Sequence, residues 1–123
     1  MITHYRELRV WQSGMELVTE VYQVTQSLPK SEIFGLTAQL QRAAVSIPAN
    51  IAEGHARDSS KEYLHHLSFA MGSLAELETL LILTKTLKYS DPSNIDRLLV
   101  KSAAEGKMLR ALQARLKERV ERG

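Results

Sequence analysis

The sequence has no cysteine and only three prolines among its 123 residues. The absence of cysteine excludes disulfides, a thiolate nucleophile and cysteine-ligated metal or iron–sulfur sites. No run of 18 uncharged apolar residues occurs, and the N-terminal stretch lacks the apolar region of a signal peptide. The length fits one domain. We therefore expect a cytoplasmic protein that forms a single domain over residues 1–123 and does not interact with a membrane.

Charge of one sign is also scarce, because the formal net charge is only +2. A balance this small does not by itself indicate a nucleic-acid partner. The charges are nevertheless unevenly distributed. Seven Lys and Arg residues stand against nine Asp and Glu before Lys88, and nine stand against five from Lys88 onward. The C-terminal part of the chain is therefore basic, whereas residues 35–55 carry only the charges of Arg42 and Glu53.

Apolar side chains recur every three or four residues along most of the chain, which is the period of an amphipathic helix. The pattern predicts four helices, at about residues 7–27, 33–54, 59–87 and 91–119. Ser59 followed by Glu62 forms a capping box, and Asp91 before Pro92 is an N-cap followed by proline at the first helical position. No strand-like alternation is present. We predict an all-α fold, an up-and-down antiparallel four-helix bundle.

The second predicted helix has more apolar surface than one bundle core requires. The side of this helix away from the core carries small uncharged residues, namely Ala38, Val45, Ala49 and Ala52. The first and third helices also have wide apolar arcs. Because monomers seldom expose large apolar patches, the surplus predicts a homo-oligomer. Pro48 removes the hydrogen bond to the carbonyl of Ala44 and predicts a kink or break. Gly72 and Ser73 indicate a close approach by another backbone.

A polar stripe follows the same second helix, and one acidic residue of the third helix completes the set: Arg42, Ser46, Asn50, Glu53, Arg57 and Glu76. Polar groups buried among helices need partners. We weigh two interpretations. The first is a network of ion pairs and hydrogen bonds that sets the register between helices or subunits, in which case Arg42→Ala should reduce stability or disturb assembly. The second is a ligand or partner cleft lined by the same groups.

The predicted fourth helix carries a basic stripe nearly opposite its apolar face. Its members lie within about 60° of one another at the helical period and are Arg97, Lys101, Arg115, Arg119 and Arg122. Such a stripe could follow a phosphate backbone and is our candidate nucleic-acid contact. Uncharged residues interrupt it, and no aromatic side chains are interleaved for base stacking. A solvated helix face is therefore the alternative interpretation.

Signatures of catalysis are few. A di-iron or di-manganese bundle needs two Glu-x-x-His elements and two further glutamates, and the sequence has one such element, Glu62 to His65. A carboxylate-bridged metal protein is thus a weak alternative. There is no nucleophile elbow, phosphate loop or dinucleotide-binding fingerprint. Glu76 and Glu78 lie about 200° apart on a helix and cannot form a paired acid/base site. We expect a protein that is not an enzyme and has no cofactor.

Residues 39–54 read QLQRAAVSIPANIAEG, and this stretch resembles the signature of the 23S rRNA intervening-sequence proteins. The similarity continues through residues 8–11, 61–63 and 72–78. One departure is His55–Ala56, where many relatives have an aromatic residue and then glycine. The resemblance implies a bacterial, cytoplasmic four-helix bundle that assembles into a homopentameric barrel, and it assigns no catalytic residues.

A related branch of that family serves as the accessory protein of diversity-generating retroelements and binds nucleic acid and a reverse transcriptase. That branch is markedly more basic than this chain, whose net charge is +2. Together, the residues and the resemblance predict a homo-oligomeric binding or scaffold protein whose partner is RNA or an RNA-associated protein. The alternative is a nucleic-acid-binding accessory protein to a reverse transcriptase.

Overall fold

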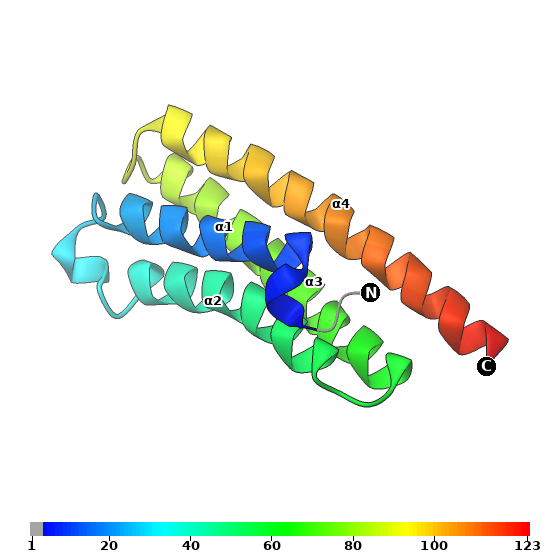
Figure 1. The fold of residues 1–123 in the computed structure, drawn as a ribbon. Coiled ribbons are helices and arrows are strands. Elements are labelled where there is room, and N and C mark those ends of the chain that lie inside the picture. Colours follow the sequence, from blue (N-terminus) through cyan, green and yellow to red (C-terminus); the bar gives the residue numbers. More distant parts are fainter. Residues whose placement is uncertain (1–3) are drawn as a thin grey trace.

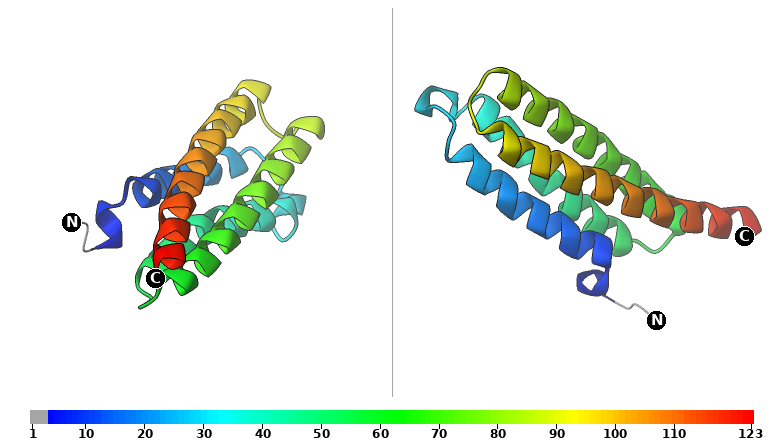
Figure 2. Two further views of the ribbon diagram at one scale, coloured as in Figure 1. Left: turned by 90° about the vertical axis from the view of Figure 1, so that its right-hand side faces the viewer. Right: turned by 90° about the horizontal axis from the view of Figure 1, so that it is seen from above.

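The structure, a computed structural model, describes residues 4–123 and consists of four α-helices joined by short connections (Figure 1). The helices are α1 (Arg9–Thr25), α2 (Leu36–His55), α3 (Ser60–Thr86) and α4 (Pro92–Arg122), and the short 3-10 helices η1 (Tyr5–Glu7) and η2 (Lys30–Glu32) precede α1 and α2. Each helix packs against the next, and α1 also packs against α4 (Figure 2). No strand occurs in the described part of the chain. The prediction of an all-α four-helix bundle is confirmed.

The helix ends follow local signals that the sequence carries. Ser59 Oγ accepts a hydrogen bond from Glu62 N at 3.1 Å and so caps α3, as predicted, and the same hydroxyl donates to Glu62 Oε2 at 3.3 Å. Asp91 Oδ1 accepts from the backbone N–H of Ser93 at 2.9 Å at the start of α4. The N-cap of α2 is different, because Glu32 from η2 accepts from the N–H of Leu36. Every predicted helix end lies within three residues of the observed one.

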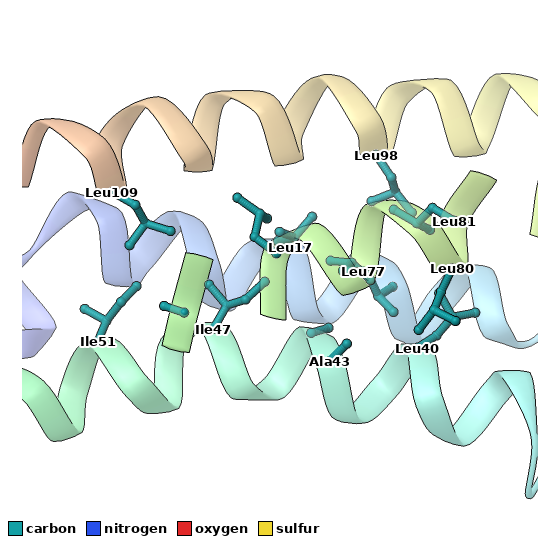
Figure 3. Close-up of a cluster of buried hydrophobic side chains, with 14 of the residues drawn as sticks. Leu17, Leu40, Ala43, Ile47, Ile51, Leu77, Leu80, Leu81, Leu98 and Leu109 are labelled. Carbon is teal, nitrogen blue, oxygen red and sulfur yellow. The ribbon is translucent and has the colours of Figure 1, made fainter. Parts of the chain in front are cut away.

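The core is a column of leucine and isoleucine side chains contributed by all four helices (Figure 3). Leu17, Ile47, Leu77 and Leu109 are examples from each helix in turn, and each is at most 1% exposed. Helix α1 carries two neighbouring apolar stripes. Leu17, Val21 and Val24 of one stripe are buried in the core, whereas Met15 and Tyr22 of the other are 44% and 43% exposed. Truncation of one such buried leucine to alanine costs about 2–5 kcal/mol of stability.

Helix α2 continues through Pro48, and the break that the sequence allowed is absent. Pro48 is buried and faces Gly14 of α1, where an added Cβ would lie 3.5 Å from the proline Cβ. The missing hydrogen bond to Ala44 removes one bond of the helical ladder. Residues on both sides of the proline, including Ala44 and Ile51, are completely buried. Packing of α2 against its neighbours therefore preserves the helix where local sequence alone would allow it to end.

Two glycines show where close packing is required and where it is not. A Cβ on Gly54 would lie 2.8 Å from Cβ of His66 and 2.8 Å from Cδ1 of Tyr63, so only glycine permits this approach of α2 to α3. By contrast, nothing lies within 4 Å of a Cβ placed on Gly72. The expectation that Gly72 admits a neighbouring backbone is wrong within the single chain, because Gly72 lies on the exposed side of α3.

Helix α3 alone, among the described helices, is long and apolar enough to cross a membrane by length and composition. Its most apolar 18-residue window has a mean hydropathy of 1.4, and 39% of that window is buried inside the bundle. A core helix of a soluble bundle meets the same criterion, so the observation carries little weight for a membrane. It does show that α3 presents little charge to its surroundings.

Glu105 of α4 is the one completely buried carboxyl group in the described chain. Oxygen Oε2 points toward Gly14 of α1, 3.1 Å from where a Cβ would lie, and neither carboxyl oxygen has a hydrogen-bond partner among residues 4–123. Burial is the main cause that raises the pKa of Glu105 to about 7, and the neighbouring Ser13 hydroxyl lowers it in part, although its geometry is not that of a hydrogen bond. An ionised carboxylate at this position is costly because the interior solvates charge poorly.

Glu105 should make the stability of the bundle depend on pH. The unfolded chain releases this proton near pH 4.5, and the folded chain keeps it to about pH 7. The folded state therefore binds more protons between these values, and the free energy of unfolding falls as pH rises through that window, by about 2–3 kcal/mol in total.

Glu105→Gln should remove this dependence, so that the variant matches the wild type at pH 4.5 and exceeds it in stability at pH 8. Urea unfolding at both pH values measures the difference. Glu121→Gln, an exposed change on the same helix, is the control. A Glu105→Gln variant with the wild-type pH profile contradicts the assignment.

Candidate functional site

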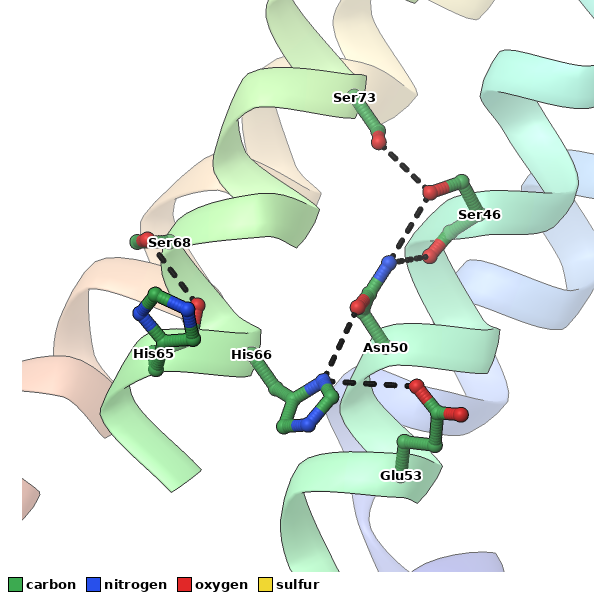
Figure 4. Close-up of polar contacts among 7 residues, drawn as sticks. All are labelled: Ser46, Asn50, Glu53, His65, His66, Ser68 and Ser73. Carbon is green, nitrogen blue, oxygen red and sulfur yellow. Dashed lines mark hydrogen bonds and ion pairs between the residues drawn. The ribbon is translucent and has the colours of Figure 1, made fainter. Parts of the chain in front are cut away.

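The predicted polar stripe forms a short hydrogen-bond chain between α2 and α3 (Figure 4). Ser46 Oγ lies 2.7 Å from Ser73 Oγ, and the amide nitrogen of Asn50 donates to Ser46 O and Oγ at 2.9 and 3.0 Å. The Asn50 amide oxygen lies 3.2 Å from Nδ1 of His66. An amide oxygen can only accept, so the proton in this bond is carried by Nδ1. The chain links the two helices at two positions, Ser46 with Ser73 and Asn50 with His66.

Glu53 extends this chain toward solvent. Its Oε2 lies 3.5 Å from the same Nδ1 of His66, and the contact becomes an ion pair when the imidazole is protonated. The His66 side chain is 14% exposed and the Glu53 side chain 64% exposed. The polar stripe predicted from the sequence does not include His66 or Ser73. Periodicity along α2 does not tell which residues of α3 lie opposite it. The spacing of His66 and Ser73 by seven residues on α3, two helical turns, is the only signal that could have found them.

The remaining members of the predicted network do not join it. Arg42 and Glu76 form a separate ion pair at 3.7 Å, with side chains 69% and 46% exposed. An exposed pair of this kind contributes little to stability. The side chain of Arg57 makes no ion pair in the described chain and lies with Lys61, Glu62 and His65 along a shallow depression. Of the six predicted residues, Ser46, Asn50 and Glu53 thus contact α3, and their role in setting register stays a prediction.

Glu62 and His65, which form the one Glu-x-x-His element of the sequence, make other contacts in the structure. The Glu62 side chain accepts a hydrogen bond from the N-cap residue Ser59, and the His65 ring packs edge-on against Phe69 with centroids 4.6 Å apart. No group of three or more His, Asp or Glu side chains that could hold a metal ion occurs within residues 4–123. The prediction that the chain has no metal or cofactor remains a prediction.

The basic stripe of α4 divides into two parts. Arg97 and Lys101 contact carboxylates of α1: Arg97 Nε lies 3.4 Å from Glu20 Oε1, and Lys101 pairs with both Glu20 and Glu16. The hydrogen bond that Lys101 donates to Glu20 is the main cause that raises the pKa of Lys101. These two cations stabilise the contact between α1 and α4, which reduces their capacity to follow a phosphate backbone.

The C-terminal part of the stripe lacks such partners. Arg122 pairs with Glu118 one turn earlier at 2.9 Å. Arg115 and Arg119 make no ion pair with any residue in the described chain, and they lie at a pocket between the ends of α2, α3 and α4. Any nucleic-acid contact by this stripe is therefore limited to its last turns.

An apolar groove runs along the outer side of α1 and α2. It has a volume of about 280 Å³ and contains no charged residue; its lining is Tyr5, Trp11, Met15, Val18, Val45, Pro48, Ala49 and Ala52. The rings of Tyr5 and Trp11 meet edge to face at 5.3 Å, and Met15 and Val45 are 44% and 43% exposed. This groove is where the outer stripe of α1 meets the small residues on the back of α2.

A second exposed apolar face lies on α3. Phe69, Ile82 and Leu83 are 50%, 52% and 42% exposed. Glu76 is the only charged residue on the exposed side of α3 between Phe69 and Leu83. Besides the groove on α1 and α2, the described chain thus exposes large apolar side chains along α3, and also before α2, where Phe34 is 93% exposed.

Comparisons with known proteins agree with this fold. A family model described as 23S rRNA-intervening sequence protein matches residues 6–111. The chain is also similar to the crystal structure of a protein with unknown function from the S23 ribosomal protein family of Bacteroides thetaiotaomicron, with a TM-score of 0.78 at 22% sequence identity, over 85% of this chain and 97% of that chain. At this identity the likeness shows the fold alone. No curated protein matches the chain.

The hydrogen-bond chain between α2 and α3 predicts a specific stability effect. Asn50→Ala removes the donor to Ser46 and the acceptor of His66, and it should lower the free energy of unfolding by about 1–2 kcal/mol. Arg42→Ala, which removes only an exposed ion pair, should change it by less than about 0.5 kcal/mol. Urea denaturation of both variants measures the two effects. A larger loss for Arg42→Ala than for Asn50→Ala would show that the network is centred elsewhere.

Proposed function

This chain belongs to the 23S rRNA-intervening sequence protein family, and we propose that it acts as a homo-oligomeric binding or scaffold protein and not as an enzyme. The observation that carries the proposal is the pair of apolar faces, the groove on α1 and α2 and the face on α3. Apolar surface of this extent on a monomer marks a site of protein association. We propose another copy of the chain as the partner, since this requires no second protein.

The two faces differ in shape and in residue content, which favours a head-to-tail arrangement. A two-fold dimer uses the same patch on both subunits, whereas a closed ring joins two different patches of each subunit. We propose that the α1–α2 groove of one subunit receives the α3 face of the next, with Phe69 as the most prominent side chain of that face. Five subunits is the number expected from the resemblance of residues 39–54 to the family signature.

RNA or an RNA-associated protein remains the proposed partner of the assembled scaffold. Because α1 carboxylates neutralise Arg97 and Lys101, the proposed contact uses the last turns of α4, repeated once per subunit. Repetition of a weak contact around a ring raises its overall affinity. The role of an accessory protein to a reverse transcriptase is the second proposal from the same resemblance, and the small net charge of the chain favours it less.

Ala49→Arg tests the groove directly. Ala49 is exposed and lines the groove, so the substitution should leave the bundle folded and place a charged side chain in the interface. We expect size-exclusion chromatography with light scattering to show smaller species and circular dichroism to show unchanged helix content. Ala111→Arg on the exposed side of α4 is the matched control and should keep the wild-type mass. A wild type that is monomeric at micromolar concentrations contradicts the proposal.

Mixing two defective variants tests the head-to-tail arrangement. Phe69→Glu should disrupt the α3 face and keep the groove, and Ala49→Arg should do the reverse. Each variant alone should be monomeric, and an equimolar mixture should form a dimer through the one intact pair of faces. If Phe69→Glu alone still dimerises, the interface joins two grooves and the ring arrangement is wrong.

A further inference from the structure

A pocket of about 590 Å³ lies at the end of the bundle where α2 ends and α3 begins, beside the C-terminal turns of α4. Its lining combines apolar side chains with polar ones. The apolar part is Leu8, Leu112 and Leu116, and the polar part is His55, Tyr63, Arg115 and Arg119. A volume of several hundred Å³ with an apolar wall and a few converging polar groups is typical of small-molecule sites.

The two arginines of this pocket lack the counter-charge that the same helix receives elsewhere. Arg115 and Arg119 are one helical turn apart, the same spacing as Arg97 and Lys101. The latter pair meets carboxylates of α1, whereas no carboxylate of the described chain pairs with Arg115 or Arg119. Like charges at this spacing repel each other. An anion between the two guanidinium groups would relieve that repulsion.

Tyr63 supplies a second, independent observation. Its hydroxyl is buried and has no hydrogen-bond partner among residues 4–123. Burial raises the pKa of this hydroxyl, and Arg115 and Arg119 are the charges that act on it in the opposite direction. Tyr63, Arg115 and Arg119 line the same pocket, and a buried donor without an acceptor is rare in folded proteins. The edge-to-face contact with the His55 ring, 5.8 Å between centroids, fixes the phenol.

We propose that this pocket binds a small carboxylic acid with an unbranched apolar chain. The carboxylate accepts hydrogen bonds from the two guanidinium groups and from the Tyr63 hydroxyl, and the chain packs against Leu8, Leu112 and Leu116. Arginine donates in a planar fork that matches a carboxylate. The apolar wall offers no partner for further polar groups of a ligand, which favours an aliphatic acid over a sugar phosphate. The inference does not depend on assembly, because one chain supplies every residue of the pocket.

Isothermal titration calorimetry with octanoate tests the ligand class. We expect one octanoate per chain. Octan-1-ol has the same chain without the charge, and acetate has the charge without the chain. Each should bind at least about tenfold more weakly than octanoate, since a charged hydrogen bond or a buried alkyl chain is lost. Equal binding of octanol or of acetate would overturn the proposal.

Variants identify the residues. Arg115→Gln and Arg119→Gln should each weaken octanoate binding about tenfold. Arg110→Gln, on the exposed surface of α4 outside the pocket, should leave the affinity unchanged. Tyr63→Phe should weaken binding about fivefold and yet leave the thermal stability of the free protein unchanged or raised, because the hydroxyl has no partner to lose. A purely structural Tyr63 would show the opposite, lower stability with unchanged binding.

A titration with a short single-stranded RNA completes the test. Octanoate binding that depends on Arg115, Arg119 and Tyr63 supports the pocket whether or not RNA competes for it. Absence of octanoate binding, or octanoate binding that is equal in all variants, overturns it. RNA binding that is lost in Arg115→Gln without any octanoate binding would assign these arginines to nucleic acid and also overturn the proposal.

Discussion

The close packing of α2 between α1 and α3 is the constraint on which the rest of the structure depends. On one side Pro48 faces Gly14, and on the other side Gly54 leaves no space for a Cβ. Because α2 and α3 approach this closely, side chains as short as Ser46 and Ser73 meet at 2.7 Å. The same proximity joins the outer surfaces of α1 and α2 into one apolar groove. The polar contact inside the bundle and the proposed contact surface outside it thus have a common cause.

The charged residues follow the same separation between contacts inside the bundle and surfaces outside it. Helices α1 and α4 are joined by ion pairs of Glu20 with Arg97 and Lys101. The groove on α1 and α2 is uncharged, which suits association with another copy of the chain. The end of α4 keeps two cations without counter-charges beside a buried hydroxyl, which suits a small anion. The proposed assembly and the proposed binding of a small anion therefore use separate surfaces and can be tested independently.

The sequence predicts the helices, the cap residues and the polar members of α2, because these depend on local periodicity and on side chain–backbone hydrogen bonds. It does not predict features that depend on contacts between helices. Both stripes of α1 are apolar, so their composition could not tell that Leu17 is buried and Met15 is 44% exposed. The continuity of α2 at Pro48 and the open surroundings of Gly72 likewise depend on where neighbouring helices lie. The pocket beside Tyr63 combines three helices and has no local signature.

The fluorescence of Trp11 tests the central claim most directly, since it is the only tryptophan of the chain and lines the α1–α2 groove. If a second subunit covers the groove, Trp11 should emit at short wavelength and resist acrylamide quenching at high protein concentration. Dilution through the dissociation range, located by light scattering, should shift the emission to longer wavelength and increase quenching. Emission and quenching that stay constant through dissociation, with Trp11 readily quenched throughout, would contradict the account.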